Sequence, residues 1–115
     1  MARYTQQYVL KILPGKLRQA ITESLESCKL NITYSTDDYI RAQEAAGSVS
    51  FSQLVTVEIL IHQNATNDGT IKFTCVAKNE ELPLRVNNHC HEVSDLVNKA
   101  LSSNKSWKVV ETISG

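Results

Sequence analysis

The sequence has few cysteines, few glycines and no excess of charge of either sign. Its three cysteines are Cys28, Cys75 and Cys90, and such an odd, sparse set excludes a disulfide framework. Twelve basic residues balance twelve acidic ones, whereas a protein that binds nucleic acid or anionic membranes without specificity normally carries a basic excess. We therefore expect neither nucleic acid nor a membrane among its partners.

Long hydrophobic runs are also absent. The longest apolar-rich stretch, residues 54–61, is interrupted by Thr56 and Glu58, and it is far shorter than the ~20 residues of a membrane-spanning helix. The N-terminus opens with polar residues and lacks the apolar segment of a secretory signal. These absences predict a soluble, cytoplasmic protein.

The motifs of common enzyme and nucleotide-binding classes are missing too. The four glycines are isolated, so the sequence offers no glycine-rich loop to cradle a phosphate. No G-x-S-x-G motif marks a nucleophilic serine. We expect no cofactor and assign no catalytic residue, so the sequence favours a protein that is not an enzyme.

What the sequence does contain is the composition of one globular domain. It has 115 residues, 42% of them apolar, which suits a single domain over residues 1–115. Two segments repeat apolar residues at the 3.6-residue period of an amphipathic helix, each with one stripe. The predicted helices cover residues 16–29 and 89–103, and either Asn87 or Asn88 would cap the second.

Other segments alternate apolar and polar residues, which is the period of a strand with one buried face. The β-branched content of the longest of them favours strand over helix. The last two strands are expected to form a hairpin around the Asp68-Gly69 corner. The predicted strands cover residues 4–13, 39–43, 49–62 and 70–78.

The predicted order is strand, helix, three strands and helix (β-α-β-β-β-α). Residues 30–34 alternate less regularly, and residues 106–113 fit either a last strand or an extended end that docks on the domain. A sheet with one apolar face needs one covering layer, and two helices with one stripe each supply it. We predict a two-layer α+β domain, with a mostly antiparallel, twisted sheet and both helices on one face.

This order resembles the TATA-binding-protein-like and helix-grip architectures, in which a helix follows a first strand and a second helix follows an antiparallel meander. The helix-grip resemblance, to proteins of the birch-pollen-allergen type, implies an apolar ligand between sheet and helix. TATA-binding proteins bind DNA with basic residues and inserted phenylalanines. Only Phe51 and Phe73 are present here, and Phe73 lies on the predicted core face, so DNA binding is not carried over.

The face of the predicted hairpin that points away from the helices is mixed in character. It would carry Leu54, Thr56, Leu60 and His62 beside Lys72, Thr74 and Val76. Scattered exposed apolar residues are ordinary, but a cluster of them can mark a contact surface for a protein partner or a second copy of the chain. The candidate interaction face consists of Leu54, Thr56, Leu60, His62 and Val76.

Residues 87–92 hold a cluster of side chains that could bind metal or act as a nucleophile, namely His89, Cys90 and His91. Zinc favours cysteine and histidine ligands, but residues two apart on a helix point to different sides. In the other interpretation, Cys90 continues the apolar stripe three residues before Val93, and the two histidines lie at the helix entrance. We keep the three as a candidate polar cluster and assign no metal to it.

Three functions are compatible with these patterns. The leading hypothesis is a non-enzymatic protein-interaction or binding module that uses the open face of the sheet. The alternative is a carrier of a small apolar ligand held between sheet and helices. The third is a metal or thiol enzyme centred on His89, Cys90 and His91. The carrier would hold its ligand with apolar side chains that would serve equally well in a solid core without a cavity. These side chains are Leu25, Ile59, Phe73, Leu96 and Val97.

Overall fold

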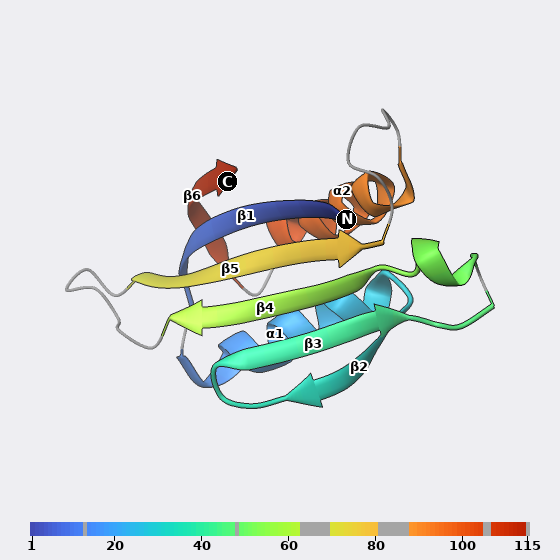
Figure 1. Cartoon of the computed structure of the whole chain (residues 1–115). Coiled ribbons are helices and arrows are strands. Elements are labelled where there is room, and N and C mark those ends of the chain that lie inside the picture. The colour runs from blue at the N-terminus through green and yellow to red at the C-terminus, as the bar shows by residue number, and fades with distance from the viewer. Residues whose placement is uncertain (13, 48, 63–69, 81–87, 105–106, 115) are drawn as a thin grey trace.

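The alternating segments fold into one sheet, and the two striped segments fold into helices behind it (Figure 1). The computed structural model describes residues 1–12, 14–47, 49–62, 70–80, 88–104 and 107–114. The helices are α1 (Pro14–Ser27) and α2 (His89–Ser103). The strands are β1 (Ala2–Lys11), β2 (Leu30–Ser35), β3 (Tyr39–Glu44), β4 (Thr56–His62), β5 (Thr70–Asn79) and β6 (Lys108–Ser114).

The sheet has the strand order β2-β3-β4-β5-β1-β6, and every neighbouring pair is antiparallel. The first strand of the chain therefore lies inside the sheet, between β5 and β6, and β2 and β6 form the two edges. The predicted pairing of β4 with β5 is confirmed, with Ile59 opposite Cys75. The Asp68-Gly69 corner, Leu13 and Ser106 lie outside the described residues.

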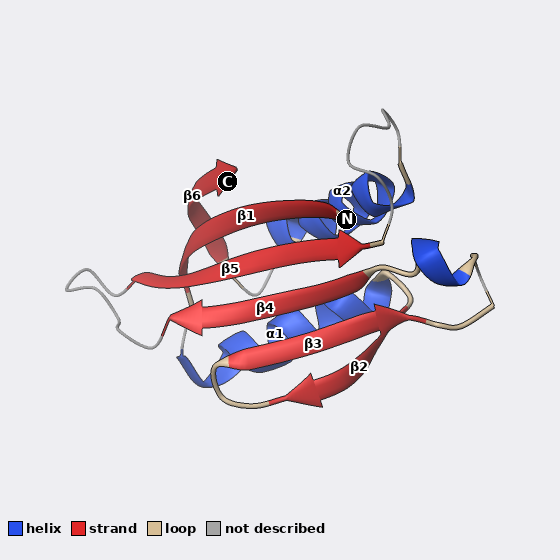
Figure 2. Cartoon of the chain, viewed as in Figure 1, coloured by secondary structure: helices blue, strands red, loops and turns tan. Residues whose placement is uncertain are grey.

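Both helices pack on the same face of the sheet (Figure 2), which confirms the predicted two-layer α+β arrangement. The core fills the space between the layers because β1 to β5 turn apolar side chains toward the helices. None of the described helices is long and apolar enough to cross a membrane. The largest fully buried side chains include Tyr8, Leu10, Ile21, Leu25, Ile40, Ile59, Phe73, Val97 and Leu101.

The strand predicted over residues 4–13 and the helix predicted over residues 16–29 each lie two residues earlier, and two other predictions differ more. Residues 30–35 form a complete strand, so four strands rather than three separate the helices. The strand predicted over residues 49–62 begins only at Thr56, because Phe51–Gln53 forms a short 3-10 turn. In this turn the Gln53 amide donates to the Ser50 carbonyl at 2.9 Å, and the Ser50 hydroxyl donates to the Gln53 side chain. Such local bonds compete with a strand ladder.

The tail and the second helix are fixed by polar contacts at their ends. β6 pairs with β1, which settles the tail as a strand over residues 108–114. Trp107, buried just before β6, donates from its indole nitrogen to the Leu101 carbonyl at 2.8 Å. At the start of α2, the Asn88 side chain accepts from the His91 amide at 2.7 Å, so Asn88 is the predicted N-cap.

Candidate functional site

An apolar pocket lies where the end of α1, the start of β2, the end of β3 and the first turns of α2 meet. Figure 1 shows the C-terminal end of α1 and the N-terminal end of α2 at the same end of the sheet. The pocket has a volume of about 380 Å³. We call it the helix-side pocket. Its lining residues are Cys28, Lys29, Leu30, Glu44, Ala45, His89, Glu92, Val93 and Leu96.

The pocket exists because α1 ends abruptly. Lys29 has a φ of 63°, in the left-handed region that commonly terminates a helix. Its amide still reaches the Glu26 carbonyl at 3.0 Å, and the chain then turns directly into β2. Leu30 is therefore buried in the sheet layer, whereas Leu96 on α2 stays 51% exposed. Both side chains line the pocket, Leu96 on its solvent side and Leu30 on its buried side.

One wall of the pocket is polar. The His89 Nε2 atom lies 2.8 Å from Glu44 Oε1 and 2.9 Å from Glu44 Oε2. Glu44 Oε1 also accepts from the Val55 amide at 2.9 Å, and Glu92 lies 3.9 Å from the other ring nitrogen of His89. The side chains of His89 and Glu44 are only 19% and 14% exposed. This contact ties the start of α2 to the end of β3 and places two carboxylates at the pocket, whose lining also includes the ammonium-bearing Lys29.

Of the three cysteines, Cys75 and Cys90 are buried, and Cys28 is partly exposed at this pocket. Its Sγ atom lies 3.7 Å from the Leu96 carbonyl, to which the thiol donates a weak hydrogen bond. Burial raises the pKa of the Cys28 thiol above its ordinary value. The raised pKa disfavours the thiolate, so the group acts as lining rather than as an activated nucleophile.

The candidate polar cluster does not converge. Cys90 is completely buried, with its Sγ atom 3.9 Å from the Ala2 carbonyl, so it belongs to the apolar stripe. His89 faces Glu44, whereas His91 makes an edge contact with the Tyr4 ring at 5.1 Å. Among the described residues no group of three or more His, Cys, Asp or Glu side chains could hold a metal ion. A shared metal or thiol centre at these three positions is therefore wrong.

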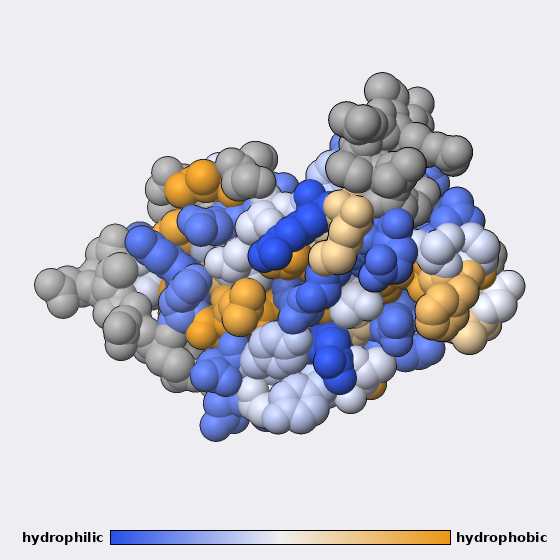
Figure 3. Space-filling model, in the orientation of Figure 1, coloured by the Kyte–Doolittle hydropathy of each residue, from blue (hydrophilic) through white to orange (hydrophobic). Residues whose placement is uncertain are grey.

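The opposite face of the sheet is the open face, and Figure 3 shows it covered mainly by polar side chains with scattered apolar ones. Leu60 is 42% exposed and His62 is also exposed, as predicted. Val76 points to the same face but is only 3% exposed, so its predicted availability to a partner is wrong. It lies in the interior of the sheet, paired with Thr5 on one neighbouring strand and Glu58 on the other.

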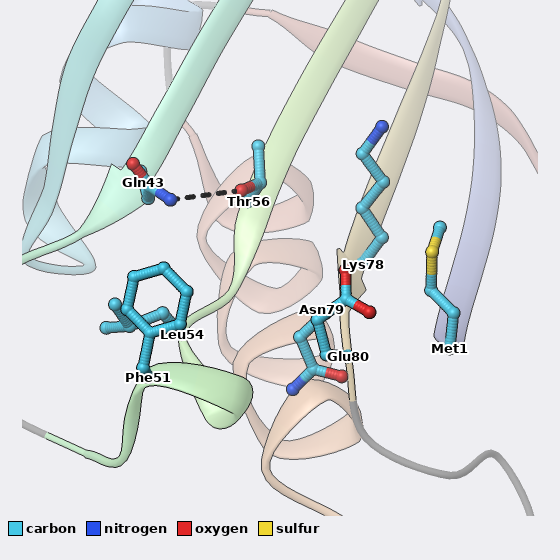
Figure 4. Close-up of a pocket in the computed structure, with 8 residues that line it drawn as sticks. All are labelled: Met1, Gln43, Phe51, Leu54, Thr56, Lys78, Asn79 and Glu80. Atoms are coloured by element: carbon cyan, nitrogen blue, oxygen red, sulfur yellow. Dashed lines mark hydrogen bonds between the residues drawn. The ribbon is translucent and has the colours of Figure 1, made fainter.

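A second pocket, of about 300 Å³, lies at one end of the open face (Figure 4). Two of the predicted interaction residues, Leu54 and Thr56, line it, and Gln43 Nε2 donates to Thr56 Oγ1 at 3.5 Å. Phe51 stands at its rim with 88% of its side chain exposed. We call this the open-face pocket. Its lining residues are Met1, Gln43, Phe51, Leu54, Thr56, Lys78, Asn79 and Glu80.

An ion pair crosses the open face beside this pocket. Lys78 Nζ lies 2.5 Å from Glu58 Oε1, and the Tyr39 hydroxyl donates to Glu58 Oε2. The Lys78 ammonium and then the Tyr39 hydroxyl hold the pKa of the Glu58 carboxyl below its ordinary value. Lys78 is therefore held by Glu58, and Tyr39, Glu58 and Lys78 form one connected polar network on the open face.

No protein-family model matches the chain, and no curated protein matches it either. Among solved structures, the chain is similar to the crystal structure of Ara h 8.0201, with 14% sequence identity and a TM-score of 0.39. The match covers 87% of this chain and 95% of that chain. At this TM-score the similarity carries no argument, so function has to come from the geometry of this chain.

Most residues of the helix-side pocket were not predicted from sequence. Of the five side chains proposed to hold a ligand, only Leu96 lines the pocket. The remaining four pack in the core with no more than 1% exposure. Ala45 gave a weak indication of the pocket in the sequence, because a run of small residues after a strand can leave space beside a helix. Glu44 gave no signal, since its partner His89 is 45 positions away.

Proposed function

We propose that this protein binds a small, mainly apolar molecule in the helix-side pocket. The observation that carries the proposal is a pocket of about 380 Å³ with an apolar lining and one polar wall. Small-molecule sites are typically concave, mainly apolar and roughly 300–1,000 Å³ in volume, with a few placed polar groups. Leu30, Val93 and Leu96 supply the apolar contact, and the pair of His89 with Glu44 supplies the polar wall.

The polar wall selects the class of ligand. Glu44 already engages His89, and Glu92 adds a second carboxylate close to the same ring. A carboxylate on the ligand would face the Glu44 carboxylate, which is only 14% exposed, and repulsion is strong in such a partly dehydrated site. Glu92 is 67% exposed and the pocket's ammonium group, on Lys29, is exposed too, so solvent weakens the effect of both charges. A hydroxyl or amine that donates a hydrogen bond fits better, so the proposed ligand is an apolar alcohol or amine.

The test uses N-phenylnaphthylamine, a neutral fluorescent probe with one N–H donor, in equilibrium titrations followed by its emission. Leu96→Asn places an amide at the pocket mouth, and because Leu96 is 51% exposed the change does not disturb the core. Leu60→Asn is the matched control on the open face, where Leu60 is 42% exposed. Near-ultraviolet circular dichroism confirms that each variant keeps its tertiary structure.

We expect saturable binding to the wild-type protein and to Leu60→Asn, with the dissociation constant of Leu96→Asn raised about tenfold, equivalent to about 1.4 kcal/mol. A medium-chain alcohol should displace the probe better than the carboxylic acid of the same length. The proposal is overturned if the wild type shows no saturable binding, or if Leu96→Asn binds as the wild type does.

A protein-interaction surface on the open face is the second candidate function, and the exposure of Phe51 favours it. An aromatic side chain that is 88% exposed at the rim of a pocket is typical of an interface anchor. Sedimentation of the labelled chain in cell extract, compared between wild type and Phe51→Ser, tests this candidate. A faster species that Phe51→Ser removes would support it, and identical sedimentation would count against it.

A further inference from the structure

The ring of Phe51 lies outside the core, yet the turn that carries it is anchored to the sheet. The ring is 88% exposed at the rim of the open-face pocket (Figure 4). The Asn79 side chain, at the end of β5, donates to the Gln53 carbonyl at 3.1 Å. The next amide, that of Glu80, donates to the Ser52 carbonyl at 3.2 Å. These bonds hold an exposed apolar ring in a fixed place, where it is available to a ligand.

Polar groups that can still form hydrogen bonds line other parts of this pocket. Gln43 Nε2 donates to Thr56 Oγ1 at 3.5 Å, which is longer than the usual range of about 2.7–3.2 Å. This weak contact leaves the Gln43 amide and the Thr56 hydroxyl able to bond to a ligand. The Glu80 carboxylate also lines the pocket, is exposed and has no ion-pair partner in the described part of the chain. The pocket therefore offers an amide, a hydroxyl and a carboxylate beside the aromatic ring.

The charges of the lining favour a neutral ligand. Glu58 compensates the charge of Lys78, and solvent weakens the effect of the exposed Glu80. A charge of either sign on the ligand therefore gains little. A hydroxyl group on the ligand suits the lining better, because it donates one hydrogen bond and accepts others. It can donate to Gln43 or Glu80 and accept from Thr56.

The arrangement of these groups favours a ring that is polar around its rim and apolar on its faces. Figure 4 shows Gln43 and Thr56 on one side of the pocket and Glu80 on the other. A pyranose ring carries hydroxyl groups around its circumference and C–H groups on its faces, and a C–H face stacks on an aromatic ring. A wholly apolar molecule would remove water from the polar groups without replacing their hydrogen bonds. The volume of about 300 Å³ is at the small end of the range for ligand sites, as a single sugar ring requires.

We infer that the open-face pocket binds a neutral sugar. A C–H face of one pyranose ring stacks on Phe51. The ring hydroxyls bond to Gln43, Thr56 and Glu80. A β-glucoside is the expected ligand, because its equatorial hydroxyls leave the flattest C–H face. This site is separate from the helix-side pocket, with which it shares no lining residue. A protein partner anchored on Phe51 would compete with the sugar for the same ring.

The test titrates methyl β-D-glucopyranoside into the isotope-labelled chain and follows the backbone amides by nuclear magnetic resonance. Phe51→Ala removes the stacking ring, whereas Phe51→Trp keeps an aromatic surface at the same place. Glu80→Gln replaces the charged acceptor with a neutral one. Tyr34→Ala is the matched control, because it removes an aromatic ring that is 54% exposed and does not line the pocket. Glycerol, which has hydroxyl groups but no ring, is the control ligand.

We expect saturable shifts at residues 51–54 and 78–80, with a dissociation constant in the millimolar range. Phe51→Ala should raise this constant about tenfold through the lost stacking, and Glu80→Gln about threefold, since hydrogen bonds to a charged acceptor are stronger. Tyr34→Ala and Phe51→Trp should bind within about twofold of wild type, and glycerol should give no saturable shift.

Three results would overturn the inference. The first is a wild type without saturable shifts in the glucoside titration. The second is Phe51→Ala binding the glucoside as the wild type does, which would place the sugar elsewhere. The third is Phe51→Trp binding as weakly as Phe51→Ala, because the residue would then act through the turn and not by stacking.

Discussion

Ile59→Ala tests which face of the sheet is buried, and both pockets depend on that assignment. Ile59 lies on β4 in the interior of the sheet, paired with Ile40 on one side and Cys75 on the other. Its side chain is completely buried and belongs to the core cluster between sheet and helices. Alanine lacks three of its carbon atoms, and at about 0.8 kcal/mol per buried carbon the lost transfer free energy is about 2.4 kcal/mol.

The cavity left behind adds to this loss, because a packed core relaxes only partly around a deleted side chain. We therefore expect Ile59→Ala to lower the free energy of unfolding by about 2–5 kcal/mol. Leu60→Ala is the matched control: Leu60 is the next residue of β4, faces the opposite side and is 42% exposed. Its truncation should lower the free energy by less than about 1 kcal/mol.

Urea unfolding followed by tryptophan fluorescence measures both variants. Trp107 is the sole tryptophan, and it is buried against the core, so its emission reports loss of the folded state. The slope of the unfolding free energy against urea concentration should be unchanged, while the urea midpoint falls. A loss below about 1 kcal/mol for Ile59→Ala, or equal losses for Ile59→Ala and Leu60→Ala, would refute the assignment of the buried face.

Two further predictions concern the titratable groups. The Lys78 ammonium lowers the pKa of Glu58 from 4.5 in the folded state, so the stabilisation it gives is present above pH 4.5 and is lost as the pH falls through the folded-state pKa. Glu58→Gln should therefore differ from wild type at neutral pH and converge with it in acid, measured as urea midpoints; a constant difference would contradict the reasoning. Cys28 alone should react with Ellman's reagent in the native protein, because Cys75 and Cys90 are buried. Labelling of more than one thiol before unfolding would contradict the burial of Cys75 and Cys90. Saturating N-phenylnaphthylamine should slow the reaction at Cys28.

Local periodicity was sufficient to predict the layers of this fold. The helix predicted over residues 89–103 has the observed bounds, since its stripe and its N-cap both act within one segment. The inward residues of β4 and β5, such as Val57 and Phe73, are buried as alternation predicts. Alternation was weakest at β2, where the edge position leaves Asn31 and Tyr34 exposed. An edge strand therefore has less contrast between its two faces than an interior strand.

Exposure within a face could not be predicted in the same way. Val76 and Leu60 both point to the open side, yet Val76 is 3% exposed and Leu60 is 42% exposed. Alternation gives the direction of a side chain but not how much of it the residues on neighbouring strands cover. Leu96 shows the converse: its place in an apolar stripe predicts burial, but it is 51% exposed because it lies where α1 has already ended.

The candidate polar cluster shows why adjacency in sequence is a poor guide to a site on a helix. Consecutive helical residues are separated by about 100° around the axis, so His89, Cys90 and His91 are driven apart by the helix that contains them. His89 instead meets Glu44, at the end of a strand that is distant in sequence. The helix-side pocket is thus built from the ends of four elements, which are the segments that open most readily. The proposed ligand would contact α2, β2, β3 and the turn that follows α1, so its binding should stabilise the whole domain by mass action and protect these segments from amide exchange.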